Sequence, residues 1–309
     1  MGLVSTTERY LFRPSFGGQL ISYSLLPLTL IYCFIAWLRF KLASLKDYDI
    51  AVVSIGNLVV GGSGKTPFTI AVAKKFEKSV IVLRGYKRKS SGLYVVSNCG
   101  EIFENVNISG DEAMLYAKSL PNSIVIVCED RVEGIKKAKE LGASIVFLDD
   151  GYGKHFIKKL DFILHSETSN SFCLPSGPYR EKLWRGKEAI VLKEDNEYFR
   201  KVTILNSSSK MLLITAISKP WRLDRWLPDN VIDKKYFPDH YMFEKSEVGE
   251  LFKKSGATSI LTTQKDAVKL ENFDLPLSIM ELDIEVSTDI ISLIKTYKKS
   301  CKEDYAKEN

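Results

Sequence analysis

The chain has 309 residues, of which 45% are hydrophobic and 27% are charged, and both fractions are ordinary for soluble globular proteins. This composition excludes a disordered chain, a collagen-like repeat and a polytopic membrane protein, and the length suits two domains. Lys and Arg number 44 against 38 Asp and Glu, which gives a net charge of +6. A surplus of this size suits an anionic ligand or a membrane surface and is too small to indicate nucleic-acid binding.

An uncharged apolar segment of 19 residues runs from Leu20 to Leu38. Its length is close to the roughly 20 residues that a membrane-spanning helix needs. Cations flank it on both sides, and Trp37 stands near its end, a pattern typical of a helix at a membrane interface. Three interpretations compete: an interfacial helix, a spanning helix and an ordinary buried helix. We predict that residues 1–40 form a membrane-associated segment.

Short apolar runs then alternate with segments of helical composition. The runs at 50–55, 79–83, 124–128 and 145–148 are rich in β-branched residues and predict strands, and the segments between them, at 68–78, 111–119 and 132–141, predict helices. This alternation indicates parallel βαβ units with helices on both faces of a sheet. A further apolar strand at 189–192 closes this first domain.

The second half of the chain predicts a smaller α/β domain. The charged stretch 193–201 is interpreted as a connection, and the runs 211–215 and 259–262 as strands of the second domain. The tail at 298–309 is polar and is expected to be solvated or frayed. The five cysteines form no C-x-x-C pair, which predicts unlinked thiols in a reducing compartment.

A glycine-rich segment, GNLVVGGSGKTP at residues 56–67, follows the first predicted strand and opens a predicted helix. In this context glycines let backbone N–H groups surround phosphate oxygens at a helix N-terminus. Lys65 is predicted to bridge the β- and γ-phosphates of a nucleotide, and the Thr66 hydroxyl to bind Mg²⁺. The standard pattern has glycine where this chain has Val59. The predicted nucleotide-binding residues are Val59, Val60, Gly61, Gly62, Ser63, Gly64, Lys65 and Thr66.

Two carboxylates, Asp149 and Asp150, directly follow the strand predicted at 145–148. In P-loop enzymes such carboxylates complete the Mg²⁺ shell, although Asp-Asp-Gly is also an ordinary turn. Beside a phosphate-binding loop we predict that Asp149 and Asp150 bind the metal together with Thr66. The expected fold is therefore α/β, with a P-loop-containing parallel, Rossmann-like sheet domain at 41–200. The smaller α/β domain at 201–309 is expected to contribute to the active-site cleft.

Two classes of protein use this apparatus, nucleotide switches and small-molecule kinases. The segment 150–153 fits the D-x-x-G motif of switches, but base recognition in switches needs [N/T]-K-x-D, and in Thr-Gln-Lys-Asp at 263–266 the lysine comes one residue too late. This mismatch weighs against guanine selectivity. The two hypotheses that stay open at this point are a small-molecule kinase and a membrane-peripheral P-loop switch that recruits a protein partner.

A kinase needs a group that positions or deprotonates the acceptor hydroxyl, and cations for the transferring charge. The candidates for the first task are Asp111, in Ser-Gly-Asp-Glu, and His240, in Phe-Pro-Asp-His-Tyr. Asp111 stands at a predicted helix start, where an ordinary N-cap is the competing interpretation. The candidate cations Arg84, Arg131 and Arg180 follow predicted strands or lie in loops, and by pattern alone each also fits a solvated surface arginine.

This combination of motifs resembles the tetraacyldisaccharide 4'-kinase family. The matches follow one another along most of the chain, and although no single motif is unique, the ordered set is specific. They are PLTLIY at 27–32, the loop at 56–67, RGY at 84–86, GDE at 110–112, DDGY at 149–152, LPSGPYRE at 174–181, FPDH at 237–240 and KDAVK at 265–269.

The resemblance implies an enzyme that transfers the γ-phosphoryl group of ATP to the 4'-hydroxyl of a tetraacylated glucosamine disaccharide 1-phosphate, with Mg²⁺, in lipid A biosynthesis. It implies that Asp111 is the base, that His240 orients it and that Lys65 stabilises the transferring charge. It also implies substrate or phosphate contacts from Arg84, Arg131, Arg180 and Glu181. The enzyme would work at the cytoplasmic face of the bacterial inner membrane on an acylated lipid substrate, with no nucleic acid and no obligate protein partner.

Three positions depart from the family pattern. Ala113 replaces a usual proline, Gly153-Lys154 replaces Gln-His, and Gln264 replaces a glutamate. The change at Gly153 removes a side chain near the predicted metal site, so the surroundings of that site are expected to differ from those in the family.

Overall fold

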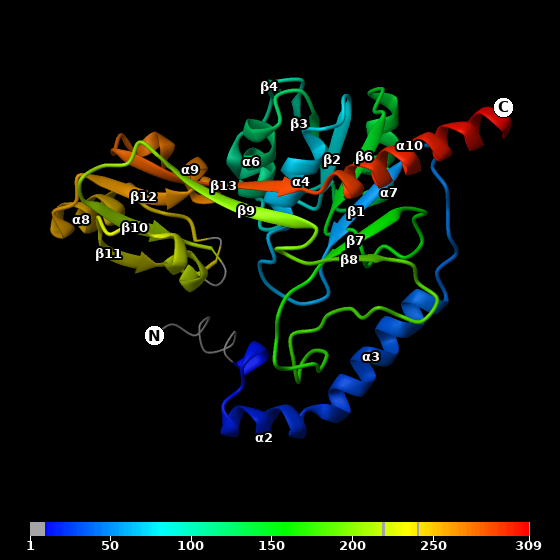
Figure 1. Cartoon of the computed structure of the whole chain (residues 1–309), viewed down its shortest axis with the longest axis horizontal. Coiled ribbons are helices and arrows are strands. Elements are labelled where there is room, and N and C mark those ends of the chain that lie inside the picture. The colour runs from blue at the N-terminus through cyan, green and yellow to red at the C-terminus, as the bar shows by residue number, and fades with distance from the viewer. Residues whose placement is uncertain (1–9, 218–219, 240, 309) are drawn as a thin grey trace.

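The computed structural model describes residues 10–217, 220–239 and 241–308, which form two sheets joined by a long two-stranded ribbon (Figure 1). The first sheet has the order β4-β3-β5-β2-β6-β1-β7-β8, and the second the order β11-β10-β12-β13-β9. The strands of the first sheet are β1 (Val52–Gly56), β2 (Ser79–Leu83), β3 (Tyr94–Asn98), β4 (Glu101–Ile102), β5 (Ile124–Val127), β6 (Ile145–Asp149), β7 (Leu160–Leu164) and β8 (Ile190–Leu192). Those of the second are β9 (Tyr198–Leu205), β10 (Met211–Thr215), β11 (Val231–Tyr236), β12 (Ser259–Thr263) and β13 (Leu277–Val286).

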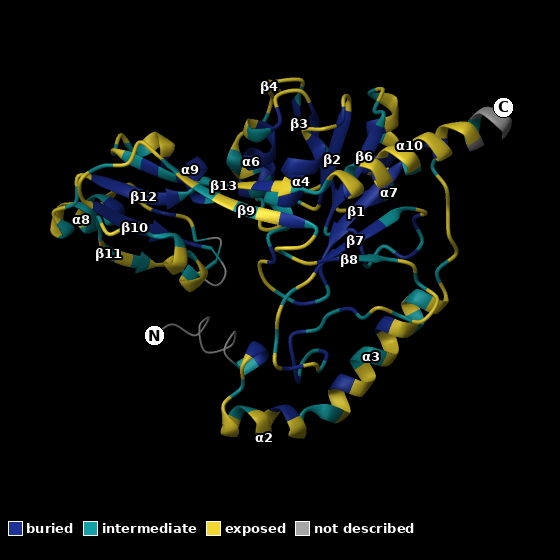
Figure 2. Ribbon diagram, in the orientation of Figure 1, coloured by how far each residue is buried: buried dark blue, intermediate teal, exposed yellow. Residues whose placement is uncertain are grey.

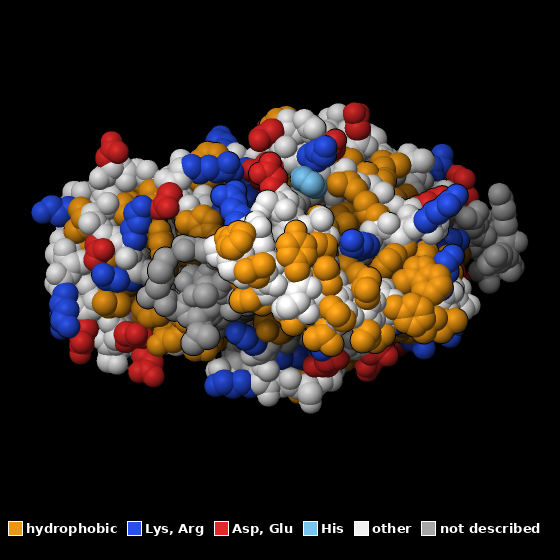
Figure 3. Space-filling model, turned by 90° about the horizontal axis from the view of Figure 1, so that it is seen from below, with side chains coloured by type: hydrophobic (Ala, Val, Ile, Leu, Met, Phe, Trp, Pro, Cys, Tyr) orange, Lys and Arg blue, Asp and Glu red, His pale blue; other side chains and the backbone are white. Residues whose placement is uncertain are grey.

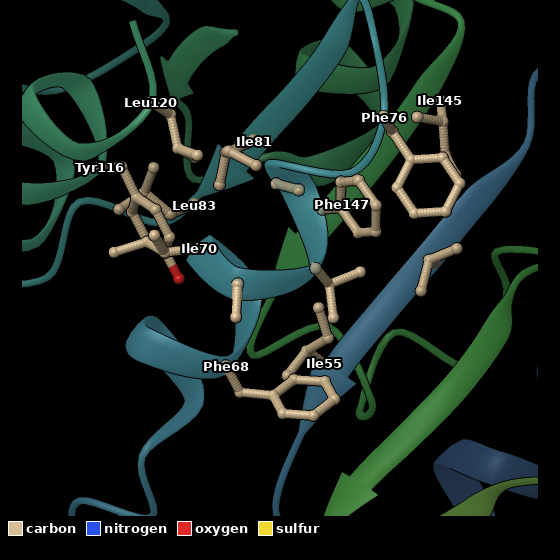
Figure 4. Packing of buried hydrophobic residues seen from close by; sticks show 14 of the residues in the cluster. Ile55, Phe68, Ile70, Phe76, Ile81, Leu83, Tyr116, Leu120, Ile145 and Phe147 are labelled. Carbon is tan, nitrogen blue, oxygen red and sulfur yellow. The ribbon is translucent and has the colours of Figure 1, made fainter. Parts of the chain in front are cut away.

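Helices cover both faces of the first sheet. In β2, Ile81 and Leu83 point into one apolar core with α4 (Lys65–Ala73) and α6 (Asp111–Ser119), whose packing Figure 4 shows. Val80 and Val82 point into a second core with α7 (Arg131–Glu140). Strands buried on both faces read as continuous apolar runs, and this is why composition alone predicted them. The α/β class and the parallel sheet are confirmed.

The central position of β1 decides where the functional loops lie. It pairs in parallel with β6 on one side and β7 on the other, while β2 pairs in parallel with β6 and β5. The carboxyl ends of these strands therefore meet at one edge of the sheet. The loops that follow β1, β2, β5 and β6 converge there, in the crevice where open α/β sheets bind ligands.

The central strands of the second sheet, β10 and β12, are also buried on both faces. Leu212 and Ile214 of β10 pack with α8 (Lys245–Ser255) and α9 (Gln264–Leu270), whereas Met211 and Leu213 lie on the side of the 3₁₀ helix η1 (Pro220–Trp226). A second 3₁₀ turn, η2 (Glu271–Phe273), follows α9.

The prediction of a connection at 193–201 is wrong from Tyr198 onward, where strand β9 begins. The strand pairs antiparallel along its length with β13, more than 70 residues away in the sequence. Its residues alternate between inward and exposed positions, so charged Arg200 and Lys201 fit a strand. A long-range ladder thus overrides the local impression of a charged loop.

The C-terminal helix α10 (Thr288–Glu308) packs against the first sheet. Ile290, Ile294 and Cys301 are buried in the same core as α4 and α6, and the Tyr305 hydroxyl donates to Asp47 Oδ1 at 2.7 Å. The expectation of a solvated or frayed tail at 298–309 is therefore wrong for the part that the structure describes. Its polar composition belongs to the outer face of an amphipathic helix.

The apolar N-terminal segment forms two helices, α2 (Phe16–Ser24) and α3 (Leu26–Lys41), bent by 60° at Leu25. Pro27, in the first turn of α3, explains the break because proline cannot donate to the preceding turn. Within the described residues no single helix has the length and apolarity to cross a bilayer, and only the bent pair together meets that criterion.

The outer faces of these two helices are apolar and exposed. The segment is therefore not an ordinary buried helix, as the exposed positions along both helices show (Figure 2). Hydrophobic side chains gather on the face of the molecule seen from below (Figure 3). The exposed apolar residues are Phe16, Leu20, Ile21, Tyr23, Leu28, Leu30, Ile31, Phe34 and Ile35. On the inner side, Thr29 Oγ1 donates to Ser176 Oγ at 2.7 Å and the Tyr32 hydroxyl to the Arg180 carbonyl at 3.0 Å, and these bonds hold α3 to the loop that carries Arg180.

Candidate active site

The glycine-rich loop joins β1 to α4, as predicted. Gly61 and Gly64 have φ of +87° and +86°, values that disfavour any residue with a Cβ. A Cβ built on Gly64 would also lie 2.9 Å from the Arg200 guanidinium. The two glycines therefore allow both the tight turn and the close approach of a side chain from the linking ribbon.

Two cations converge on this loop. Lys65 Nζ and Arg180 NH2 both donate to Asn57 Oδ1, at 3.0 and 2.7 Å. Asp150 forms an ion pair with Arg180, and its Oδ1 lies 3.6 Å from Lys65 Nζ. Burial opposes ionisation of Asp150, but the charges of Lys65 and Arg180 outweigh it and lower the pKa of the carboxyl. Lys65, Arg180 and Asp150 thus form one charged cluster at the phosphate loop.

Asp149, the last residue of β6, is a buried carboxyl group with a shifted pKa. Burial and the nearby carboxylate of Glu112 raise the pKa of Asp149 to about 7. Its Oδ1 has no hydrogen-bond partner in the described part of the chain. The Arg131 guanidinium donates to the main-chain carbonyls of Asp149, at 3.2 Å, and Cys128, at 2.7 Å. Arg131 therefore fixes the backbone that presents Asp149.

The donors at this edge fit Mg²⁺. The ion prefers oxygen ligands and is usually held by one or two carboxylates, with water and phosphate completing its shell. Asp149 supplies a buried carboxylate oxygen without a partner, and the Thr66 hydroxyl and Asp150 line the same cavity. No cluster of three or more His, Cys, Asp or Glu side chains suited to a metal occurs among the described residues, which is compatible with so sparse a protein ligand set.

A cavity of about 810 Å³ lies between the two sheets, and the phosphate loop forms one wall. The opposite wall comes from the ribbon, η1 and α9, and includes apolar side chains such as Leu223, Trp226 and Met280. The predicted site residues that line the cavity are Val60, Gly61, Gly62, Ser63, Gly64, Lys65, Thr66, Arg84, Arg131, Asp149, Asp150 and Arg180.

The other predicted site residues have different surroundings. Val59 is buried in a small apolar cluster with Leu11 and Phe12, which explains a valine in a glycine-rich loop. Asp111 and Glu181 are buried just outside the cavity lining. His240 falls outside the described residues.

Asp111 is the first residue of α6, and the N-cap is Gly110, with φ +85° and no capping side chain. The alternative interpretation of Asp111 as an ordinary N-cap is therefore wrong. Its carboxylate faces α9 of the second unit, where Lys269 Nζ lies 3.2 Å and Lys265 Nζ 4.0 Å from Oδ2. Burial lowers the pKa of Lys265, but the carboxylates of Glu112, Asp111 and Asp239 outweigh this effect and raise it.

Glu181 explains the glycine at position 153. A Cβ on Gly153 would lie 2.9 Å from Glu181 Oε1, so the missing side chain leaves room for this carboxylate. Glu181 Oε2 lies 3.6 Å from His155 Nε2, and His155 Nδ1 is 2.7 Å from the buried ammonium of Lys187. The departure from the family pattern thus admits a buried polar cluster behind Arg180.

The sequence analysis expected the second domain to contribute to the cleft, but it missed the arginines and the glutamate that this unit and its linking segment bring to the phosphate loop. Arg200 of β9 approaches Gly64, Arg222 NH1 donates to the Gly62 carbonyl at 3.4 Å, and Glu194 forms ion pairs of 3.0 Å with both Arg200 and Arg225. The only local signal was the concentration of arginine and tryptophan in PWRLDRW at 220–226, which carries no known motif.

Similarity to known proteins agrees with this geometry. A family described as tetraacyldisaccharide-1-P 4'-kinase matches residues 21–206 and 193–297. The tetraacyldisaccharide 4'-kinase of Aliarcobacter butzleri is 47% identical over 306 residues, covering 96% of this chain and 97% of that protein. That of Helicobacter pylori strain HPAG1 is 44% identical over 293 residues, covering 94% of each.

A solved structure is similar in fold as well. The crystal structure of the "apo" form of LpxK from Aquifex aeolicus in complex with ATP has a TM-score of 0.71 and 26% identity, covering 90% of this chain and 99% of that one. With a family match along most of its length and relatives above 40% identity, the chain belongs to the tetraacyldisaccharide 4'-kinase family.

Proposed function

We propose that the cavity between the two sheets transfers the γ-phosphoryl group of ATP to the 4'-hydroxyl of a tetraacylated glucosamine disaccharide 1-phosphate, a precursor of lipid A. The observation that carries the proposal is a phosphate loop opening onto a cavity of about 810 Å³ in a member of this kinase family. Family membership makes the chain an ATP-dependent kinase and does not favour the nucleotide-switch alternative.

On the nucleotide side, the backbone N–H groups of residues 59–66 would surround the phosphates. Lys65 and Arg180, already held at the loop by Asn57, would stabilise charge on the transferring group. Thr66, Asp149 and Asp150 would hold Mg²⁺, which when bound neutralises phosphate charge. Because these groups are fixed before ATP binds, little reorganisation accompanies the reaction.

On the acceptor side, Asp111 would take the proton of the 4'-hydroxyl, and His240 would orient the carboxylate. The hydroxyl oxygen forms a bond to the γ-phosphorus while the bond from that phosphorus to the bridging oxygen of ADP breaks. Arg84, exposed on the cavity wall, is suited to contact an anionic group of the lipid. The contacts of Arg131 and Glu181 support indirect roles, in holding Asp149 and the Arg180 loop.

The exposed apolar face of α2 and α3 would lie on the cytoplasmic face of the bacterial inner membrane. Its large apolar side chains, such as Leu30 at 69% exposure and Phe34 at 58%, would enter the interface between headgroups and acyl chains. Arg39 and Lys41 in the last turn of α3 would contact anionic headgroups. A lipid substrate would then reach the cavity without leaving the membrane.

The test is transfer of label from γ-labelled ATP to the acylated disaccharide by the purified full chain. We expect labelled lipid, and we expect Lys65→Ala and Asp111→Ala each to lower turnover by at least about 100-fold, as for the loss of a charge-stabilising donor or a base. Hydrolysis of ATP or GTP without labelled lipid would favour the switch. Near-normal turnover in folded variants would refute the roles of Lys65 and Asp111.

A further inference from the structure

Lys269 is a buried lysine that connects the two units of the protein. It lies on α9, its side chain is 2% exposed, and its Nζ lies 3.1 Å from Asp266 Oδ1 and 3.2 Å from Asp111 Oδ2. Asp111 belongs to α6 of the first unit, whereas Asp266 and Lys269 belong to α9 of the second. One ammonium group therefore bridges a carboxylate from each side of the interface.

Asp266 holds the ammonium group of Lys269 in a fixed position. Asp266 Oδ2 accepts hydrogen bonds of 2.8 Å from Thr215 Oγ1 and from the Ala216 amide, and one of 3.2 Å from Thr263 Oγ1. These three donors, at the ends of β10 and β12, leave Oδ1 facing Lys269. The position of the ammonium is thus set by the second sheet and does not depend on Asp111.

Lys265, one helical turn earlier, has a different setting. It is 19% exposed, lines the cavity and lies 3.9 Å from Glu112 Oε1 and 3.4 Å from Asp239 Oδ1, besides its 4.0 Å approach to Asp111. Lys265 is thus shared among carboxylates at the cavity wall, where a ligand can reach it. Lys269 stands behind Asp111, away from the cavity.

Stability alone does not account for Lys269. Removing a charged side chain from water costs several kcal/mol, and a buried ion pair often stabilises a fold no better than apolar side chains of the same volume. A buried ammonium with carboxylates on both sides does, however, fix the orientation of those carboxylates and favour their ionised form.

We propose that Lys269 is a positioning residue for the kinase reaction: it holds Oδ2 of Asp111, so that the carboxylate meets the acceptor hydroxyl ionised and in a fixed orientation. The proposal rests on the proposed role of Asp111 as the base. Because Lys269 comes from the other unit, the base is fully positioned only when α9 is docked against α6. The charged groups that face Asp111 from the described elements are Lys265 and Lys269 on α9. On its own helix, the Glu112 main-chain amide donates to Asp111 Oδ1 at 3.0 Å.

The first experiment measures kcat, KM and the pH dependence of kcat/KM for Lys269→Met and Lys269→Arg. For Lys269→Met we expect kcat to fall about 10- to 100-fold with KM for ATP changed less than about twofold. The acid limb of the profile should move to higher pH by about one unit or more, because a carboxylate that loses its nearest cation accepts a proton more readily. Lys269→Arg, which keeps the charge, should restore most of the rate.

Lys254→Met is the matched control, since Lys254 lies on α8 of the same unit with a 78% exposed side chain. It should leave the rate and the pH profile unchanged. If Lys269→Met does not fold, Lys269→Gln takes its place, because it keeps a hydrogen-bond donor without the charge. An unaltered rate and pH profile in a folded Met or Gln variant would overturn the proposal.

A double-mutant cycle with Asp111→Asn separates positioning from general structural support. If Lys269 acts through Asp111, Lys269→Met should cause no further loss in single-turnover rate when Asp111 is already Asn. An equal loss in both backgrounds would overturn the proposal and assign Lys269 a structural role. Near-normal turnover of Asp111→Asn alone would instead refute the proposed base, so the two failures are distinguishable.

Discussion

At the scale of single residues, the protonation state of Asp149 should control how tightly the site binds Mg·ATP. Its carboxyl is buried, has an oxygen without a hydrogen-bond partner in the described structure and has a pKa of about 7. A bound cation requires the ionised form, which predominates only above that pH. The affinity of the enzyme for Mg·ATP should therefore rise by roughly tenfold between pH 6 and pH 8.

Titration calorimetry with ATP and Mg²⁺ at a series of pH values would measure this rise. Since the nucleotide itself titrates in the same range, Asp149→Asn is the control: it should bind more weakly and show only the pH dependence of the nucleotide. A wild-type profile that coincides with that of Asp149→Asn would contradict the prediction.

The residues predicted from the sequence are those whose chemistry is carried by local motifs. Lys65 and Thr66 follow β1 within one loop, and Asp149 and Asp150 follow β6 directly, so one strand and one turn were enough to locate them. Lys269 lies in the motif KDAVK at 265–269, which by itself indicates no chemistry for this lysine, and Arg200 lies in no motif. They reach the site only because α9 docks on α6 and β9 pairs with β13, contacts between segments far apart in the chain.

At the scale of elements, burial on both faces made β1, β2, β5 and β6 of the first sheet easy to predict, whereas β3 and β4, which are partly exposed, were not predicted. Strands β9 and β13 were missed because they alternate polar and apolar residues and leave one face partly exposed. The N-terminal segment was recognised by its apolarity, but composition does not show that Pro27 divides it into two helices. In α10, polar residues hid the buried positions Ile294 and Cys301.

The exposed face of α3 permits a direct test of membrane binding. Leu30 and Phe34 lie one turn apart on this face, 69% and 58% exposed. Inserting such side chains into a bilayer gains on the order of 1.5–3 kcal/mol each. The double variant Leu30→Glu, Phe34→Glu should therefore bind vesicles containing anionic lipids at least about tenfold more weakly in sedimentation assays, with ATP binding unchanged.

The control for this experiment is the pair Ile102→Glu, Phe103→Glu. These residues are 41% and 50% exposed and lie at β4, at the far end of the molecule from α2 and α3 (Figure 1). They should leave vesicle binding unchanged. Equal binding by the α3 variant and the wild type would show that this face does not contact the membrane.

At the scale of the whole molecule, the ribbon of β9 and β13 joins the two sheets at the cavity. The chain leaves the first sheet through β9 and returns through β13 to α10, which packs in the first core. The second unit is thus inserted in the sequence between β8 and α10, which both pack in the first unit. The phosphate loop of the first unit forms one wall of the cavity, and the arginines and α9 of the second unit complete it.

Arg200 of the ribbon approaches the phosphate loop closely, since a Cβ built on Gly64 would lie 2.9 Å from its guanidinium. Its Nε and NH2 are buried and form no well-aligned hydrogen bond among the described residues. NH2 lies 3.0 Å from Glu194 in an ion pair, and Glu194 is shared with Arg225. A phosphate would satisfy these donors, since guanidinium groups bind phosphate oxygens strongly. We expect Arg200→Leu to weaken ATP binding about tenfold, a loss of about 1.4 kcal/mol.

Thermal unfolding in the presence of increasing ATP measures this effect, because a ligand stabilises the folded state in proportion to the logarithm of its concentration over Kd. Lys201→Leu is the matched control, since Lys201 is the next residue of β9 and points to the exposed side. The Arg200 variant should require about tenfold more ATP for the same rise in Tm, and the Lys201 variant the same amount as the wild type. If both variants respond to ATP as the wild type does, the ribbon joins the two sheets without contributing to nucleotide binding.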